Sequence, residues 1–222
     1  MFYLVKTPSL LKKLYPDCIW DIKTTENEIY LTFDDGPHPR ATRFVLHELK
    51  KYNAKATFFC IGKNVEEHFD VYKQMILEGH KPGNHTFHHL NGWKTDDKKY
   101  LDDIKLAADI IDSEFFRPPY GRATKFQMKA LQKDKFQLKI VMWDVLSGDF
   151  DEKLTPENCY LNVVKNVKPG SVIVFHDSLK ALPRLEHALP LVLRFFSEKR
   201  FQFKTLPSLE KNWAGVDTQA RF

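Results

Sequence analysis

Strand-like runs alternate with stretches of helical spacing along most of the chain. The runs that predict strands, the clearest of them continuously apolar, fall at residues 29–33, 56–61, 81–84, 114–117, 138–143, 171–175 and 201–206. Between them, apolar residues recur three or four positions apart, as at Val45 and Leu49, and predict helices. About seven strands alternating with helices are typical of a parallel α/β sheet or barrel. Because the clearest runs are continuously apolar, we expect both faces of the sheet to be covered.

Three of the expected helices have recognisable ends. Apolar residues over 65–76 predict one helix that stops at Gly79. Thr155 stands directly before a proline, and this pair predicts the start of another helix. A last helix is expected over residues 183–200, with an interruption at Pro190, because a proline inside a helix removes a hydrogen bond.

The chain reads as one domain with a short leading segment. No internal repeat, low-complexity tract or Gly/Ser linker divides the 222 residues, so we expect a single domain over residues 21–222. Residues 1–20 are set apart because a short amphipathic turn containing Leu10 and Leu14 ends at Pro16. We expect this segment to pack across the outside of the barrel, and an anchor on a membrane surface is the alternative.

The composition is that of a globular protein. Hydrophobic residues make up 43% of the chain and charged residues 28%, which excludes a disordered chain and a collagen-like repeat. The net charge of +5 comes from 34 basic and 29 acidic residues that are mixed along the chain. This mixture favours a solvated surface over a nucleic-acid-binding one, so no nucleic-acid partner is expected.

No apolar run is long enough to predict a transmembrane segment. The apolar stretch near the start is also shorter than the ~7–15 residues of a secretory signal. The 3 cysteines are too widely spaced for a disulfide framework or a metal clip, and we expect free thiols. The sequence therefore predicts a cytoplasmic location by default, with association with the cell envelope as the alternative. It leaves the oligomeric state open, with a slight preference for a monomer.

Chemically active residues gather where the predicted strands end. In parallel barrels the carboxyl ends of the strands form the rim on which active sites are built. The residues at or just past these ends are Asp34, Asp35, His85, Arg117, Asp149 and His176. Their shared position favours a single site more strongly than any one of them does.

Two histidines and an aspartate pair indicate a metal site. His85 and His89 are four residues apart, which on a helical turn places both rings on one face. With one of the adjacent Asp34 and Asp35 they would form a two-histidine, one-carboxylate set with open coordination positions, as in catalytic sites. His88 falls elsewhere on that turn and is not expected to bind. An ordinary turn and two surface histidines are the simpler alternatives.

The neighbouring residues indicate one role each for Arg117 and His176, and each has one simpler alternative. Arg117 begins a stiff Arg-Pro-Pro segment, where its guanidinium would be well placed to pair with a carboxylate. The alternative is a surface arginine beside a turn. His176 follows an apolar strand and is a candidate acid or base with Asp149 as its orienting partner. A buried histidine satisfied by its neighbours is the alternative.

Five short motifs, taken in order, resemble the polysaccharide deacetylase family, which is carbohydrate esterase family 4 or the NodB-homology domain. The motifs are Thr32-Phe33-Asp34-Asp35-Gly36, His85-Thr86-Phe87-His88-His89, Arg117-Pro118-Pro119-Tyr120-Gly121, Trp143 with Asp149-Phe150, and Val174-Phe175-His176. The resemblance runs from about residue 29 to residue 206. It implies a distorted (β/α)7 barrel with parallel strands in a single domain.

The resemblance also implies a metal-dependent hydrolase. The residues that would bind one divalent metal ion are Asp35, His85 and His89. The ion is expected to be Zn²⁺, with Co²⁺ or Ni²⁺ as alternatives. Such an ion lowers the pKa of bound water toward ~7, which makes a nucleophile available at neutral pH.

Other motif residues would move protons and stabilise charge, again by family role. Asp34 would be the catalytic base and would be held by Arg117. His176 would be the general acid that protonates the departing amine, and Asp149 would tune it. The backbone N–H of Tyr120 would help to bind the oxyanion.

The motifs depart from the family pattern at three positions. Leu146 stands where the family commonly has Asp, Phe150 where it has Trp, and Val174 where Leu is usual. Phe150 and Val174 are expected to line the pocket for the acetyl methyl group. Since every metal and catalytic position is filled, the departures bear on substrate preference, and a pseudoenzyme is not expected.

The sequence therefore predicts an enzyme that removes N-acetyl groups from a GlcNAc-containing glycan of the peptidoglycan or chitin type. The nearest alternative is an O-acetyl ester hydrolase acting on acetylated xylan-like polysaccharide. Two other classes are disfavoured. One is a non-haem iron(II) oxygenase, since two histidines and a carboxylate also suit that metal, and the other is a glycan-binding module without turnover.

Overall fold

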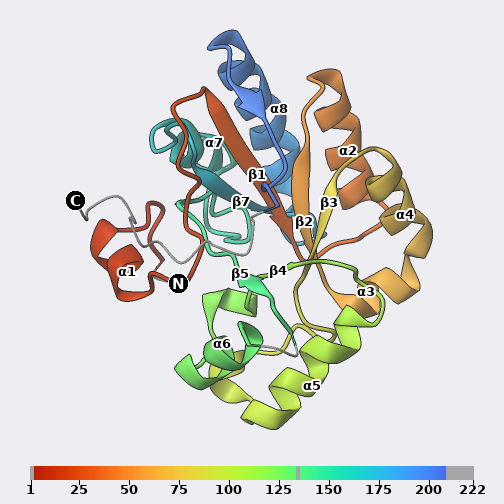
Figure 1. The fold of residues 1–222 in the computed structure, drawn as a ribbon. Coiled ribbons are helices and arrows are strands. Elements are labelled where there is room, and N and C mark those ends of the chain that lie inside the picture. Colours follow the sequence, from red (N-terminus) through yellow and green to blue (C-terminus); the bar gives the residue numbers. More distant parts are fainter. Residues whose placement is uncertain (1–2, 134–135, 209–222) are drawn as a thin grey trace.

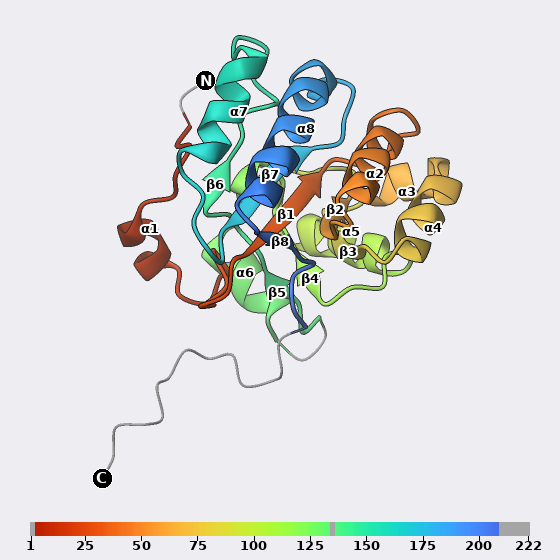
Figure 2. The ribbon, with the colours of Figure 1, turned by 90° about the horizontal axis from the view of Figure 1, so that it is seen from above.

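A curled parallel sheet forms the centre of the molecule (Figure 1, Figure 2). The computed structural model describes residues 3–133 and 136–208. Its strands are β1 (Glu28–Asp34), β2 (Ala56–Cys60), β3 (Lys81–Asn84), β4 (Phe115–Phe116), β5 (Lys139–Ile140), β6 (Val145–Leu146), β7 (Val172–His176) and β8 (Gln202–Phe203). They follow the order β5-β4-β3-β2-β1-β7-β6, with β8 beside the start of β1, and every pairing is parallel. The predicted distorted parallel barrel is thus confirmed, as a sheet that stays open between β5 and β6.

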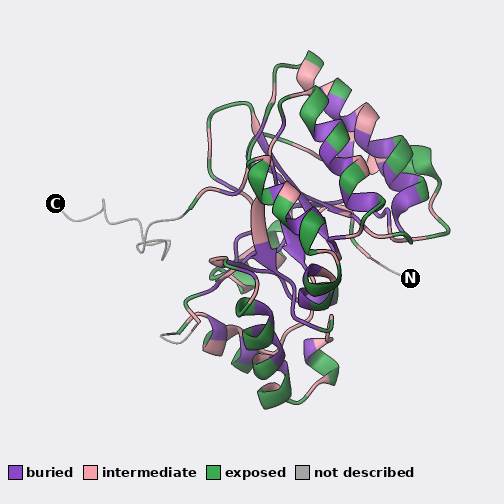
Figure 3. Ribbon diagram, turned by 90° about the vertical axis from the view of Figure 1, so that its right-hand side faces the viewer, coloured by how far each residue is buried: buried purple, intermediate pink, exposed green. Residues whose placement is uncertain are grey.

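Helices connect the strands and cover the sheet. They are α1 (Ser9–Leu14), α2 (Ala41–Lys51), α3 (Gly62–Glu67), α4 (Phe69–Leu77), α5 (Asp97–Ala108), α6 (Lys125–Leu131), α7 (Pro156–Val164) and α8 (Leu182–Glu198), with short 3₁₀ turns η1 (Gly92–Lys94) and η2 (Pro119–Gly121). Figure 3 shows buried residues on the inner faces of the helices and exposed residues on the outer faces. In the described part of the chain, no helix has the length and apolar character needed to cross a bilayer.

The central strands are buried on both faces, as their continuous apolar runs predict. The ring of Phe33 on β1 stacks against Phe58 of β2 at 5.0 Å and against Phe175 of β7 at 6.0 Å between centroids. The register of β1 and β7 places Asp34 opposite His176. Packing of this core therefore fixes the positions of two polar residues at the carboxyl ends of the strands.

Two helices differ from the sequence prediction. The stretch predicted as one helix over residues 65–76 forms α3 and α4, which are separated at His68, where the backbone has a φ of −133°. The expected interruption at Pro190 is wrong, because α8 continues through this residue. An internal proline costs about 3 kcal/mol, but Leu189 and Leu193 beside it are fully buried. Burial of such side chains contributes about 1.5–3 kcal/mol each, which keeps the helix intact.

Residues 3–21, here called the N-terminal arm, bridge β5 and β6 at the open side of the sheet. The N–H of Leu146 donates to the carbonyl of Val5 at 2.8 Å, and the N–H of Ile19 donates to the carbonyl of Ile140 at 2.8 Å. We expected the leading segment to pack across the outside of the barrel. Its described part supplies the hydrogen bonds that these two strands do not make to each other.

Two lysines bind the N-terminal arm to one buried carboxylate. The Nζ atoms of Lys6 and Lys12 lie 2.5 Å and 2.6 Å from the two oxygens of Asp144, whose side chain is fully buried. The hydroxyl of Ser171 donates to the same carboxylate at 2.6 Å. Burial alone would raise the pKa of Asp144, but these hydrogen bonds lower it below its usual value. Asp144 therefore acts as the attachment point of the arm.

Replacing Asp144 by asparagine should destabilise the protein, because Lys6 and Lys12 lose the buried carboxylate that they share. We expect the free energy of unfolding to fall by about 1.5–3 kcal/mol, the range for a hydrogen bond to a charged group, when measured by urea unfolding. The matched control is Asp102→Asn, since Asp102 pairs with Lys98 on the solvent face of α5 and its loss should leave the midpoint unchanged. Equal midpoints for Asp144→Asn and the wild type would contradict this account.

Candidate active site

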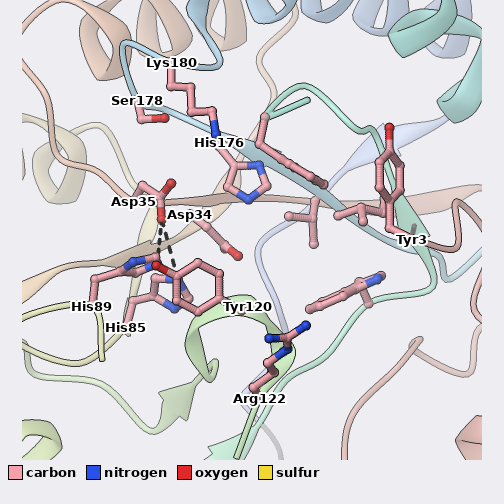
Figure 4. A pocket seen from close by; sticks show the side chains of 15 residues that line it. Tyr3, Asp34, Asp35, His85, His89, Tyr120, Arg122, His176, Ser178 and Lys180 are labelled. Atoms are coloured by element: carbon pink, nitrogen blue, oxygen red, sulfur yellow. Dashed lines mark ion pairs between the residues drawn. The ribbon is translucent and has the colours of Figure 1, made fainter. Parts of the chain in front are cut away.

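The carboxyl ends of the strands surround a pocket with a volume of about 390 Å³ (Figure 4). The residues proposed from the sequence that line it are Asp34, Asp35, His85, His89, Tyr120, Phe150, Val174 and His176. The remaining two, Arg117 and Asp149, are fully buried and contact the lining residues from behind. All ten residues therefore belong to one site.

The two adjacent aspartates face different partners because the backbone turns between them. β1 ends at Asp34, and Asp35 adopts a left-handed conformation with a φ of +79°. The Asp34 carboxylate, which is nearly buried, contacts Arg117. The more exposed Asp35 carboxylate faces two histidines. The turn thus directs the two adjacent carboxylates toward different partners.

Asp35, His85 and His89 form a group suited to a divalent metal ion. The Oδ1 atom of Asp35 lies 3.1 Å from Nε2 of His89 and 3.8 Å from Nε2 of His85 (Figure 4). The three ligand atoms lie within 4.8 Å of one another. One carboxylate and two imidazoles leave coordination positions open, as in catalytic zinc sites.

The state of His85 also fits metal binding. Its Nδ1 donates to the backbone carbonyl of Arg117 at 2.7 Å, since a carbonyl can only accept, and this leaves the Nε2 lone pair directed toward Asp35. Burial lowers the pKa of His85 to about 4, so the ring is neutral at pH 7. A neutral imidazole is the form that binds a metal ion.

The loop that carries the histidines is not the helical turn expected from their spacing. Thr86 and His89 have φ values of +63° and +56°, so the segment is an irregular loop after β3. The carboxylate of Asp103 on α5 accepts the N–H groups of Phe87 and His88 at 2.9 Å and 3.0 Å and fixes this loop. The rings of His85 and His89 still approach to 5.1 Å between centroids.

Arg117 is fully buried and holds Asp34 from below the pocket floor. Its Nη1 donates to Asp34 Oδ1 at 2.6 Å and to the hydroxyl of Thr32 at 2.8 Å. Its Nε and Nη2 donate to the carbonyls of Val141 and Met142 at 3.1 Å and 2.9 Å. Because these contacts fix the guanidinium on two sides, the Asp34 carboxylate has a defined position at the pocket.

His176 is partly buried, and the carboxylate of Asp149 holds it. Its Nδ1 lies 2.7 Å from Oδ1 of Asp149, and its backbone N–H donates to Oδ2 of Asp149 at 2.7 Å. Burial alone would lower the pKa of His176, but the charge and the hydrogen bond of Asp149 raise it to about 9. The ring is therefore protonated at neutral pH, with its Nε2 left for the pocket (Figure 4).

A family model described as polysaccharide deacetylase matches residues 21–138, which include the aspartate turn, the histidine loop and Arg117. This chain belongs to the polysaccharide deacetylase family. It is 35% identical over 189 residues to a peptidoglycan-N-acetylglucosamine deacetylase of Bacillus cereus, covering 82% of this chain and 68% of the relative. It is 34% identical over 163 residues to a chitooligosaccharide deacetylase of Azorhizobium caulinodans, covering 70% and 76%.

The fold of this family member agrees with that of a solved relative. The crystal structure of the Bc1960 peptidoglycan N-acetylglucosamine deacetylase superimposes with a TM-score of 0.82 at 32% sequence identity. The match covers 90% of this chain and 95% of that one. The parallel sheet and its surrounding helices are therefore those of a polysaccharide deacetylase.

Aromatic rings also line the pocket of this deacetylase-family chain. The ring of Phe150 lies edge-on to His176 at 5.2 Å, and the ring of Tyr120 lies 4.7 Å from His89. Tyr120 has a φ of +60° at the end of the Arg-Pro-Pro segment. Val174 and Leu146 complete an apolar wall. The three positions at which the sequence departs from the family pattern thus all line the pocket.

Sequence reasoning missed residues that support the site. Asp177 accepts the N–H of Gly36 at 3.0 Å and the hydroxyl of Thr42 at 2.5 Å, and burial raises its pKa to about 7. A Cβ at Gly36 would lie 2.0 Å from Asp177 Oδ2, so only glycine fits here. The position of Asp177 directly after His176 was a usable signal. Asp103, in contrast, reaches the histidine loop from a helix and leaves no local trace in the sequence.

The two aspartates should respond differently to the same substitution. Loss of a residue that only hydrogen-bonds to a metal ligand typically lowers metal affinity roughly 10–100-fold. Asp35→Asn should lower the affinity for Zn²⁺ by more than this, because it removes a charged ligand. Asp34→Asn should leave the affinity close to that of the wild type, since Asp34 pairs with Arg117. Competition with a chromophoric zinc chelator measures both affinities, and a urea titration checks that each variant is folded. Equal loss of zinc in the two variants would contradict this division.

Proposed function

We propose that this chain is a metal-dependent N-deacetylase that acts on a GlcNAc-containing glycan. The observation that carries the proposal is the convergence of three groups on one pocket. These are the cluster of Asp35 with two histidines, the Asp34 carboxylate held by Arg117, and the imidazole of His176 held by Asp149. A base, an acid and a metal-binding cluster around one cavity are what hydrolysis of an amide requires.

In the proposed reaction Asp35, His85 and His89 hold the divalent metal ion, which when bound activates water and polarises a carbonyl oxygen. Asp34 takes the proton of the attacking water, and its buried ion pair with Arg117 keeps its oxygens aimed at the pocket. The backbone N–H of Tyr120 donates to the acetyl oxygen as negative charge develops there.

His176 completes the reaction by protonating the departing amine. An amide nitrogen is a poor leaving group, so the reaction needs an acid at this step. The carboxylate of Asp149 holds Nδ1, which leaves the proton on Nε2 for transfer to the sugar nitrogen. Phe150 and Val174 line the pocket where the acetyl methyl group would lie.

The relatives support the choice of an N-acetyl substrate. Two of them are named for deacetylation of peptidoglycan N-acetylglucosamine and of chitooligosaccharides. An acetylated glycan is accordingly the partner that we propose, and action on peptidoglycan would place this chain at the cell envelope.

Acetate release from GlcNAc oligomers and from acetylxylan, measured in parallel with and without a chelator, tests this proposal. We expect zinc-loaded protein to release acetate from the GlcNAc oligomers and to lose this activity with the chelator. Release from acetylxylan alone would replace the proposal by an O-acetyl esterase, and release that the chelator does not affect would refute metal dependence.

His176→Ala should lower kcat on GlcNAc oligomers by about 10²–10⁴-fold, the usual contribution of a general acid or base. The effect should be large because the amine cannot leave unprotonated. His187→Ala is the matched control, since His187 lies on the surface and pairs with Glu157. Steady-state kinetics measures kcat, and a variant that keeps nearly full activity would show that His176 is not the acid and would favour the ester substrate.

Asp149→Asn should move the alkaline limb of the pH–rate profile to lower pH. Asp149 raises the pKa of His176 to about 9. The protonated form of His176, which is the acid, is therefore present below about pH 9 and is lost as the pH rises through this value. Without the negative charge the pKa of His176 falls, so the loss of activity begins earlier. A profile of kcat against pH, recorded for both proteins, measures the shift. An alkaline limb that does not move would separate Asp149 from the acid.

A further inference from the structure

Tyr3 of the N-terminal arm lies in the wall of the catalytic pocket, far in sequence from every other residue there. Figure 4 shows Tyr3 on the opposite side of His176 from Asp35 and His89. The side chain is therefore outside the reacting centre, where a part of the substrate beyond the acetyl group would lie.

Ring contacts connect Tyr3 to the general acid. The ring of Tyr3 lies edge-on to Phe150 at 5.1 Å, and Phe150 lies edge-on to His176 at 5.2 Å. A Cβ at Gly148, which has a φ of +82°, would lie 2.8 Å from the Tyr3 hydroxyl, so glycine leaves room for the phenol. Burial and the neighbouring Asp151 raise the pKa of Tyr3 to about 12, which keeps the hydroxyl neutral.

The N-terminal arm is attached to the same segment that forms the apolar wall. The hydroxyl of Thr7 donates to the carbonyl of Trp143 at 2.7 Å, and Trp143 and Leu146 both line the pocket. Lys6 and Lys12 hold the arm to the buried Asp144 between these two residues. The docking of the arm therefore determines where Tyr3 lies.

The pocket is much larger than an acetyl group. Its volume of about 390 Å³ falls in the range of roughly 300–1,000 Å³ that accommodates a drug-sized ligand. Aromatic side chains offer rigid apolar surface beside a polar tip, and the apolar C–H faces of sugar rings can pack on such surface. The wall that contains Tyr3 is thus suited to a sugar unit next to the one that is deacetylated.

We infer that Tyr3 is a specificity-determining residue, whose ring packs against a neighbouring sugar of the glycan when the N-terminal arm is docked. The inference rests on the proposed function and deepens it, because it assigns the residue that contacts a second sugar unit of the glycan. Tyr3 acts in binding and takes no part in proton transfer.

The test is a comparison of KM and kcat for a GlcNAc tetramer, using proteins tagged only at the C-terminus. Tyr3→Ala should raise KM by roughly 3–10-fold, the size of one aromatic contact, and should leave kcat within about twofold. Tyr3→Phe keeps the ring and should match the wild type. Leu4→Ala is the control on the same arm, because Leu4 is 46% exposed and does not line the pocket.

A second variant tests the arm without altering the pocket wall. Lys12→Ala removes one of the two lysines that hold Asp144, so it should raise KM in the same direction as Tyr3→Ala. Thermal unfolding of each variant shows whether it is folded at the assay temperature.

The possible results separate this inference from the proposed function. A wild-type protein that releases no acetate from the tetramer would overturn both. An active wild type with an unchanged KM in Tyr3→Ala, or an equal rise in Leu4→Ala, would overturn the inference alone. A fall in kcat at constant KM would also overturn it, because Tyr3 would then act on His176 through Phe150.

Discussion

The site depends on the ion pair and the hydrogen bonds that the buried guanidinium of Arg117 makes. Arg117 joins Asp34 at the end of β1 to the carbonyls of Val141 and Met142, and its own carbonyl fixes the ring of His85. Burial lowers the pKa of Arg117, and the Asp34 carboxylate opposes this change. Loss of either partner would leave the other charge buried and unpaired, which is far more costly than the pair itself is stabilising. The strand ends and the Asp34 carboxylate are therefore positioned together.

Local environment gives identical side chains opposite properties. His85 is buried and His176 is partly buried, yet their pKa values move in opposite directions, to about 4 and about 9. His85 faces a carbonyl and is neutral, which is the form able to bind a metal ion, whereas His176 faces the carboxylate of Asp149 and is protonated, which is the form able to act as an acid. A similar division separates Asp34 from Asp35 across one backbone turn. Pairs of groups with separated pKa values are a general feature of acid–base sites.

The sequence predicts those features that depend on neighbouring residues. Continuous apolar runs located the strands of the sheet, and the polar residues that follow them were found at one rim, because parallel strands end at the same edge. The expected helical turn at the histidines failed because Asp103, on a later helix, imposes an irregular loop. The particular contacts of the N-terminal arm could not be predicted, since Lys6 and Asp144 are 138 residues apart and no local pattern relates them. Pro190 stays helical because tertiary packing outweighs its local preference.

The central claim is that a single metal ion, held by Asp35, His85 and His89, drives hydrolysis of an acetyl group. It is tested most directly by titrating zinc back into chelated protein while acetate release from a GlcNAc oligomer is followed in the same sample. The account predicts no release at the start and a linear rise that stops at one equivalent of zinc per chain. Full activity in the metal-free protein, or a rise that continues well beyond one equivalent, would contradict it.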